Sequence, residues 1–327
     1  MLHIVKSPGS CGELLQGSID GQDFLVTCPI NLYSYAISGD NLKIRLDAVK
    51  GIIEPHLPEE LWRYLDAEVT ESNVNINTNT NIITDTLSLQ SKSLHAVELA
   101  GITGNDVNNI IGLSQLLQGK GLASSSADIS AVAMAASLLK GKTLSYEELA
   151  KLCLAIEPSD ASFYPGSVQF DYYKGKVTRY LGELPSMKLV IFDEGGTVDT
   201  VAFNSRIDLK EKVAAKEDVI REAFELLLAG FERGDSSLIG RAATMSALAN
   251  QSILYKKHVP TLVEIGKETG SLGLVVAHSG TVMALLYPVD QMTDEIVPHV
   301  LQRCADLSYL YTVNTINTGI TYVTIKE

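Results

Sequence analysis

The chain has 327 residues, of which 46% are hydrophobic and 20% are charged, and its formal net charge is -13. This length predicts two domains with enough apolar residues for a full core, so neither metal ions nor disulfides are needed to hold the fold. The negative electrostatic field of such a protein repels a phosphate backbone, which argues against a general nucleic-acid-binding protein. A local site can still hold an anion such as ATP.

No targeting or membrane segment is predicted. The cysteines form no C-x-x-C pair and indicate reduced thiols. Residues 1–20 lack the charged-then-apolar pattern of a signal peptide. Two long apolar stretches contain polar residues, Asp128 in 122–139 and His278 in 272–289, which indicates buried core and not membrane spans. We therefore expect a cytoplasmic protein with no membrane or nucleic-acid partner.

The N-terminal third is predicted to form strands. Apolar residues alternate at 24–30 and again at 42–46, and a turn at 38–41 separates the two runs. The stretch 73–81 alternates Asn with Val, Ile or Thr. Its period of two favours a half-buried strand, and low complexity is the alternative interpretation.

Two helices follow in the middle of the chain. The alanine-rich run 126–139 predicts a buried helix. Ser145 and Glu148 make a capping box for the next helix. That helix should stop at Glu157, because Pro158 disfavours helical geometry in the residue before it.

The pattern restarts after about residue 183. We expect a buried strand at 187–192, a long amphipathic helix at 211–231 and a glycine-rich strand pair at 273–287. A helix near 295–309 and a strand at 319–325 complete the chain. No repeat or flexible linker separates the parts, so the two domains should pack closely.

The run 119–127, Gly-Lys-Gly-Leu-Ala-Ser-Ser-Ser-Ala, lies directly before a predicted helix. Small residues let the backbone approach a phosphate, and successive N–H groups at a helix N-terminus bind anions. Three consecutive hydroxyls can also donate to phosphate oxygens or bind Mg²⁺. The alternative is a serine-rich N-cap of an ordinary helix. The predicted phosphate-binding residues, which would bind ATP if the phosphate belongs to that nucleotide, are Gly119, Lys120, Gly121, Leu122, Ala123, Ser124, Ser125 and Ser126.

Two other nucleotide-binding motifs are incomplete. The run 119–124 lacks the third glycine of a dinucleotide fingerprint. The run 141–143, Gly-Lys-Thr, is similar to the end of a Walker A loop, but Ala136 stands where the first glycine is required and a helix precedes it. Neither motif is therefore assigned.

The motifs resemble those of the GHMP kinases, a superfamily named for galactokinase, homoserine kinase, mevalonate kinase and phosphomevalonate kinase. The 119–127 run resembles their second motif, although no proline precedes it and alanine replaces the middle glycine. Residues 7–17 (SPGSCGELLQG) with 28–34 (CPINLYS) resemble one branch, the L-threonine kinases of cobalamin synthesis. The same branch favours G-K-G-[ML]-A-S-S-[ST]-A-D-I, which 119–129 matches, and residues 273–282 fit its third motif.

This resemblance implies an α+β, two-domain GHMP kinase fold. Residues 1–183 would form an ATP-binding N-terminal domain like domain 2 of ribosomal protein S5. Residues 184–327 would form a ferredoxin-like C-terminal domain, with the active site between the two. The resemblance also implies ATP and Mg²⁺ as cofactors and a small hydroxyl-bearing substrate, an amino acid. It predicts no particular oligomeric state.

The resemblance further implies roles for the acidic segment after the second predicted helix. Ser125 and Glu157 would hold Mg²⁺, and Asp160 stands where several GHMP kinases have a catalytic aspartate. The alternative is that Asp160 only caps the following turn. In many relatives a lysine of the first motif pairs with this aspartate. Ser10 occupies that position here, which leaves Lys6 and Lys120 as candidate partners.

The first motif supplies substrate contacts across the superfamily, and the third closes over the acceptor. The carboxylate of Glu13 and the amide of Gln16 suit an amino group and a hydroxyl, or else form a solvated turn pair. His278 either contacts the substrate or is structural. Asp128 either interacts favourably with the dipole of the helix that follows the loop or approaches Mg²⁺. The predicted substrate-binding residues are Ser10, Cys11, Gly12, Glu13, Gln16, His278 and Ser279.

The expected function is ATP-dependent phosphorylation of L-threonine to O-phospho-L-threonine for cobalamin synthesis. Homoserine kinase, or another GHMP metabolite kinase, is the alternative within the same class. A GHMP-fold sensor that binds a ligand without catalysis is the alternative from another class. The set Ser125, Glu157 and Asp160 argues against a sensor, which has no need of it.

Overall fold

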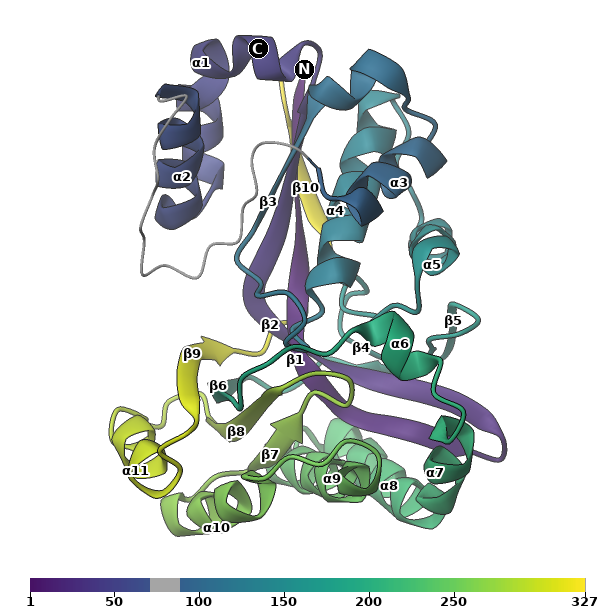
Figure 1. Ribbon diagram of the computed structural model, residues 1–327, viewed down its shortest axis with the longest axis vertical. Helices are drawn as coiled ribbons and strands as arrows, with labels where there is room; N and C mark the ends of the chain where they lie inside the picture. Colours follow the sequence, from purple (N-terminus) through teal and green to yellow (C-terminus); the bar gives the residue numbers. More distant parts are fainter. Residues whose placement is uncertain (71–88, 327) are drawn as a thin grey trace.

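The structure, a computed structural model, describes residues 1–70 and 89–326, so the predicted strand at 73–81 lies outside the described residues. A long hairpin of β1 (Leu2–Ile19) and β2 (Gln22–Gly39) forms its axis. Figure 1 shows this hairpin running from the N-terminal half of the molecule into the C-terminal half. Both halves therefore share one sheet.

The described residues form a ten-stranded sheet in the order β5-β4-β2-β1-β7-β8-β6-β9, with β10 paired to β1 and β3 paired to β2. All the strand pairings are antiparallel, and β10 lies against the first residues of β1, with Leu2 opposite Ile325. The remaining strands are β3 (Ile110–Ser114), β4 (Ser167–Asp171), β5 (Lys176–Gly182), β6 (Met187–Asp193), β7 (Gly273–Val276), β8 (Val282–Pro288), β9 (Ser308–Asn314) and β10 (Thr321–Ile325).

In the N-terminal half, α4 (Ser124–Leu139) packs on β1 and β2, and α3 (Ser91–Leu99) and α5 (Tyr146–Ile156) pack on α4. The alanines of α4 make this close approach possible, because Ala131, Ala133, Ala135 and Ala136 are all fully buried. A second pair, α1 (Leu42–Ile53) and α2 (Glu59–Thr70), packs through a separate apolar cluster that includes Ile37.

In the C-terminal half the strands lie in the order β7-β8-β6-β9, with helices on one face (Figure 1). The chain order β6, helices, β7, β8, α11, β9 is the β-α-β-β-α-β arrangement of a ferredoxin-like domain. The helices are α6 (Thr200–Asn204), α7 (Leu209–Ala215), α8 (Glu217–Arg233), α9 (Ser236–Ala249), α10 (Val259–Thr269) and α11 (Ile296–Arg303). Short 3₁₀ helices occur at Glu54–His56, Gly104–Asn109 and Asn250–Ser252.

Most of the predicted elements are confirmed. The run 24–30 lies in β2, and the later strands are β6, β7, β8 and β10. The capping box of α5 is present: the Ser145 backbone N–H donates to Glu148 Oε2 (2.9 Å), and the Glu148 N–H donates to Ser145 Oγ (3.2 Å). The helix ends as expected, since Glu157 is extended, with φ −163°.

Three predicted elements are wrong in part. Residues 42–46 are helical and not a strand. The buried set Leu42, Leu46, Val49 and Ile53 follows helical spacing, and the predicted alternation at 42–46 shares only Leu42 and Leu46 with it. The helix at 211–231 breaks at Lys216, between α7 and α8. The helix near 295–309 stops at Arg303, and β9 follows.

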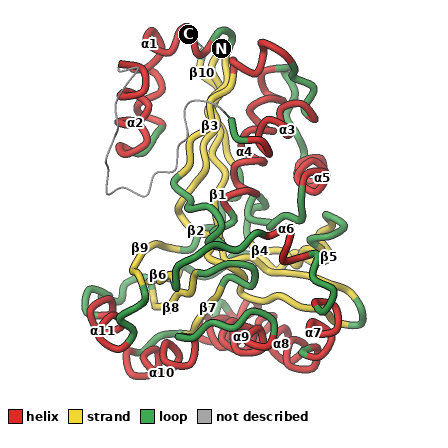
Figure 2. The backbone as a smooth tube through the Cα atoms, viewed as in Figure 1, coloured by secondary structure: helices red, strands yellow, loops and turns green. Residues whose placement is uncertain are grey.

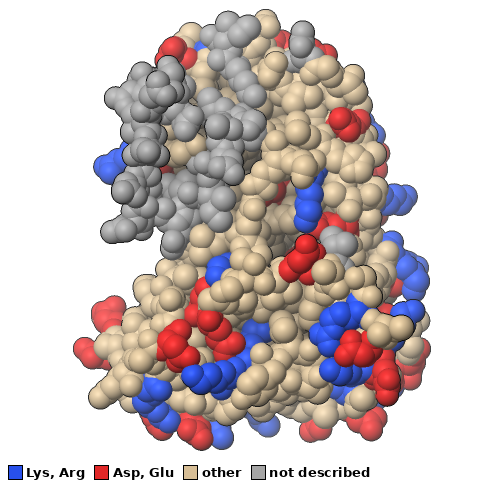
Figure 3. All heavy atoms as spheres, in the orientation of Figure 1, with Lys and Arg blue, Asp and Glu red and all other residues tan. Residues whose placement is uncertain are grey.

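Loops gather where the two halves meet (Figure 2), and the N-terminus of α4 lies at this junction. The expected domain boundary at 183/184 falls in the connection between β5 and β6. Over the C-terminal half, the face drawn in Figure 3 intersperses acidic and basic side chains. Within residues 1–70 and 89–326, no helix has the length and apolarity that crossing a bilayer requires.

Candidate active site

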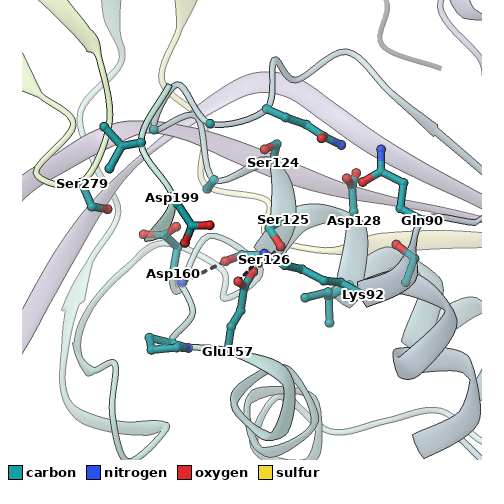
Figure 4. A pocket seen from close by; sticks show the side chains of 18 of the residues that line it. Gln90, Lys92, Ser124, Ser125, Ser126, Asp128, Glu157, Asp160, Asp199 and Ser279 are labelled. Carbon is teal, nitrogen blue, oxygen red and sulfur yellow. Dashed lines mark hydrogen bonds and ion pairs between the residues drawn. The ribbon is translucent and has the colours of Figure 1, made fainter. Parts of the chain in front are cut away.

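A cavity of about 390 Å³ lies at the junction of the two halves. Its walls come from the start of α3, the loop before α4, the segment after α5 and the residues before α6, together with Glu13 and Ser279 (Figure 4). The predicted phosphate loop and the predicted acidic segment therefore line one cavity. The charged residues that line it are Glu13, Lys92, Asp128, Glu157, Asp160 and Asp199, and Ser279 stands at the same wall.

The loop before α4 depends on three residues with positive φ: Gly119 (68°), Gly121 (88°) and Ala123 (55°). Only glycine adopts this region freely, so Ala123 is a strained position. It is the N-cap of α4, and the first backbone bond of the helix is Ala127 N–H to Ala123 C=O (2.9 Å). The N–H groups of residues 124–126 thus precede the helical ladder and can bind an anion.

The first and third motifs hold this loop in place. The Gly12 N–H donates to the Gly121 C=O (3.1 Å), and the Thr281 N–H donates to the Lys120 C=O (2.8 Å). A Cβ on Gly121 would lie 2.2 Å from the Cβ of Ala277. The glycine is required by this approach as well as by its φ, so all three predicted motifs meet at one point.

Side chains of the loop are bonded to the acidic segment (Figure 4). The Ser125 hydroxyl donates to Glu157 Oε1, and Lys92 Nζ donates to Glu157 Oε2 (2.5 Å). The Asp160 backbone N–H donates to Ser126 Oγ (3.0 Å). The loop and the acidic segment, which are separated in the chain by α4 and α5, are thereby fixed side by side.

Glu13 is a buried carboxyl and Asp160 a half-buried one, and both have raised pKa values. Burial, with the charges of Glu13 and Glu157, raises the pKa of Asp160 to about 8. Burial also raises the pKa of Glu13 to about 7, although the bond from the His278 N–H and the charges of Lys256 and Lys216 each lower it. A carboxyl with a pKa near neutrality suits proton transfer at physiological pH. Two mutually repelling carboxylates also favour a cationic group between them.

Glu13 belongs to a buried hydrogen-bond chain. The His278 backbone N–H (2.8 Å) and Nδ1 (2.9 Å) both contact Glu13 Oε2. Nδ1 also faces the Val276 carbonyl (3.3 Å), so it must carry the hydrogen, and Nε2 accepts from Ser246 Oγ (2.9 Å). The Ser246 hydroxyl in turn accepts from the Gln16 backbone N–H (3.3 Å). Burial, with the charges of Lys216 and Lys256, lowers the pKa of His278, which keeps the ring neutral.

Two buried lysines support this chain. Lys256 Nζ donates to the Ala277 C=O (2.8 Å), and Lys216 Nζ donates to Asn250 Oδ1 (3.4 Å). Burial lowers the pKa of each to about 8. Their charges favour the ionised form of Glu13 from behind the cavity.

Several predicted site residues do not present their side chains to the cavity. Those of Cys11 and Leu122 are fully buried in the core between the halves. Ser10 Oγ is buried without a hydrogen-bond partner in the described part of the chain. The Gln16 side chain bonds Tyr172. These four residues can contribute only backbone groups or packing to the site. Glu13 of the first motif and Ser279 of the third motif do line the cavity.

Neither candidate lysine pairs with Asp160. Lys120 Nζ is 2.6 Å from Asp193 Oδ2 and donates to the Gly196 C=O (2.7 Å). Lys6 Nζ lies over the Tyr33 ring, 4.9 Å from its centroid. Both ammonium groups are engaged elsewhere.

Asp128 is held by hydroxyl groups. The Ser34 hydroxyl donates to its Oδ1, Ser114 gives a second side-chain bond, and burial raises the pKa of Asp128 to about 6. The residue lines the cavity, but its bonds tie α4 to β2 and β3. These contacts favour the structural interpretation.

The sequence prediction missed Lys92, Asp199, Ser246 and the buried lysines. No motif marks them. In the sequence, nothing distinguishes Lys92 from a solvent-exposed lysine of a short helix. The packing of α3 on α4 brings it to Glu157. Asp199 caps the start of α6, accepting from the Ala202 N–H (2.9 Å).

Ser125 and Glu157 offer two hard oxygen donors at the phosphate loop. No cluster of three or more His, Cys, Asp or Glu side chains suited to a metal occurs among residues 1–70 and 89–326. Mg²⁺ usually takes one or two protein oxygens and completes its shell with phosphates and water. Ser125 and Glu157 are therefore suited to an Mg²⁺ ion that is also bound by a nucleotide, and not to one held by protein ligands alone.

Comparison with known proteins defines the class. Residues 90–166 match the family described as GHMP kinases N terminal domain. The whole fold matches that of homoserine kinase from Cytophaga hutchinsonii, with a TM-score of 0.60, 17% identity and coverage of 98% of this chain and 97% of that one. Residues 90–166 therefore form a GHMP kinase N-terminal domain, and the fold of the chain is that of the GHMP kinases. Together with the curated relatives, this supports an ATP-dependent kinase that acts on an alcohol group.

Two curated relatives share most of the chain. It is 27% identical over 285 residues to the L-threonine kinase of Salmonella typhimurium, which covers 86% of this chain and 82% of that protein. It is 28% identical over 287 residues to the L-threonine kinase of Citrobacter freundii, with 87% and 86% covered.

Proposed function

We propose that this protein transfers the γ-phosphoryl group of ATP to the hydroxyl of L-threonine, giving O-phospho-L-threonine for cobalamin synthesis. The similarity to two L-threonine kinases supports the acceptor. One observation carries the proposal for the site: the phosphate loop, Glu157, Asp160 and Glu13 line a single cavity.

In this proposal the loop 119–126 holds the phosphates of ATP. The N–H groups at the start of α4 and the hydroxyls of Ser124, Ser125 and Ser126 would bind the phosphates. The positive end of the helix dipole stabilises their negative charge. Ser125 and Glu157 would hold Mg²⁺, which neutralises phosphate charge when bound. Lys120 and Leu122 contribute backbone only, since their side chains point elsewhere.

Asp160 is the proposed general base. Phosphoryl transfer depends mainly on alignment and charge stabilisation, and a carboxylate can orient the acceptor hydroxyl and take its proton. The hydrogen bond from the Asp160 backbone N–H to Ser126 Oγ supports a position of Asp160 beside the proposed phosphate site. The raised pKa makes it a stronger base than an exposed aspartate.

Glu13 is the proposed recognition group for the amino group of the acceptor. Its carboxylate lines the cavity, is oriented by His278 and repels the charge of Asp160. An ammonium group placed between the two carboxylates relieves that repulsion. This favours an amino acid over a neutral or purely acidic alcohol, and Ser279 stands at the same wall.

Two further proposals accompany this assignment. Residues 1–183 and 184–327 are proposed as the two domains, although β10 pairs with β1 across that division. A cytoplasmic location is proposed because Cys11, Cys28, Cys153 and Cys304 are all buried free thiols, as expected in a reducing compartment.

The test is an acceptor screen with ATP and Mg²⁺. L-Threonine, L-serine, L-homoserine and mevalonate are compared by ADP release, and the product is identified by ³¹P NMR. Protein carrying Asp160→Asn, purified identically, controls for contaminating kinases. L-Threonine should give the highest kcat/KM. Turnover of homoserine but not of threonine would replace the proposed acceptor, and ATP binding without transfer to any acceptor would support a sensor.

A further inference from the structure

The charge of the cavity is unbalanced. Among its described lining residues, five side chains are acidic and one is basic. ATP adds several more negative charges, and helix N–H groups offset only part of them. The acidic residues are Glu13, Asp128, Glu157, Asp160 and Asp199, and the basic residue is Lys92.

Lys92 lies in the first turn of α3, and its side chain extends toward the start of α4 (Figure 4). Its Nζ donates to Glu157 Oε2 (2.5 Å), and the other oxygen of Glu157 accepts from the Ser125 hydroxyl. One carboxylate therefore separates this ammonium from the phosphate loop. The Glu157 side chain is 3% exposed and well fixed, whereas that of Lys92 is 47% exposed and reaches the open cavity.

The other lysines near the three motifs are engaged away from the cavity. Lys120 pairs with Asp193, and Lys6 lies over Tyr33. Lys216 and Lys256 are buried behind Glu13, on Asn250 and the Ala277 carbonyl. None of these four is among the residues that line the cavity.

We propose that Lys92 is the phosphate-binding cation of this site, positioned by Glu157. An ammonium group has three hydrogens, and the bond to Glu157 uses one of them. The remaining donors can bind oxygens of the terminal phosphates held by the loop, as charge-assisted hydrogen bonds. This inference rests on the proposed ATP site and gives that site a positive side chain.

The inference predicts a selective loss of polyphosphate binding. In Lys92→Met, affinity for ATP and ADP should fall by roughly 10- to 100-fold, the range of a lost charge-assisted hydrogen bond. Affinity for AMP, which lacks the terminal phosphates, should change less than about twofold. Lys92→Arg keeps the charge and should retain most of the ATP affinity.

Isothermal titration calorimetry measures this, with ATP, ADP and AMP, each in MgCl₂ and in EDTA. Lys176→Met, at an exposed position at the start of β5, is the matched control and should bind like the unchanged protein. Circular dichroism and thermal unfolding check that each variant is folded.

Each outcome separates the inference from the proposed function. If the unchanged protein binds no ATP, the ATP site itself is wrong. If the unchanged protein binds ATP and Lys92→Met binds it within twofold, Lys92 does not hold phosphate. Equal losses for AMP and ATP would also overturn the inference, because they indicate that Lys92 only supports the shape of the site.

Discussion

Glu13 and His278 are joined by two hydrogen bonds that end on one oxygen. The backbone N–H of His278 lies 2.8 Å from Glu13 Oε2, and its Nδ1 lies 2.9 Å from the same atom. The two residues belong to the first and third motifs, 265 positions apart in the chain. Their contact fixes the carboxylate of Glu13 at the cavity wall.

Glu13→Gln should weaken acceptor binding. Glutamine keeps the size of the side chain but removes the charge that we assign to the amino group of the acceptor. The KM for L-threonine should rise roughly 10- to 100-fold, as for a lost charged hydrogen bond, while the KM for ATP stays within twofold. Initial rates at varied concentrations of both substrates measure this. An unchanged KM for L-threonine would exclude Glu13 from acceptor recognition.

Asp160→Asn should abolish most turnover. An amide cannot take the acceptor proton, and general bases contribute roughly 10²- to 10⁴-fold to rates. The backbone bond from Asp160 to Ser126 remains, so ATP affinity should be nearly unchanged. Single-turnover kinetics and calorimetry separate the two quantities. A kcat comparable to that of the unchanged protein would show that Asp160 is not the base.

The same substitution should alter the pH dependence of stability. The pKa of Asp160 is raised from 3.8 to about 8, so the folded state binds its proton more tightly than the unfolded state. This contribution to stability is full below about pH 4 and is lost as the pH rises toward 8. The Tm of Asp160→Asn relative to the unchanged protein should therefore increase from pH 5 to 8 and then level off. Calorimetric scans that show a constant difference would contradict the raised pKa.

Ala123→Gly should stabilise the fold slightly. Ala123 has φ 55°, a region that disfavours residues with a Cβ. Glycine removes this strain but increases the entropy of the unfolded chain, so we expect a net gain of up to about 1 kcal/mol in urea denaturation. Gly121→Ala is the matched opposite: its Cβ would meet that of Ala277, so this variant should be clearly destabilised. Loss of stability in Ala123→Gly would mean that the alanine methyl group has a packing role.

The predictable features were those set by neighbouring residues. The capping box at Ser145, the end of α5 before Pro158 and the anion loop at 119–126 each depend on a few adjacent positions. The resemblance to the GHMP kinases also indicated Glu157 and Asp160, which the structure brings to the loop through Ser125 and Ser126.

The remaining features depend on long-range packing. Lys92 reaches the cavity because α3 packs on α4, and nothing near it in the sequence marks this. Lys216 breaks the predicted helix where its ammonium turns inward toward Asn250, although the amphipathic pattern continues on both sides. The run 42–46 is too short to distinguish a strand from a helix.

The pairing of β1 with β10 has a consequence for the order of folding. During synthesis β1 leaves the ribosome long before its neighbour at Thr321–Ile325, which emerges only after both halves have been translated. Until then, one edge of the nascent N-terminal half carries unpaired backbone groups, which are prone to aggregation. The sheet can therefore close at this edge only after the whole C-terminal half has been synthesised, which makes this pairing a late, non-local step of folding.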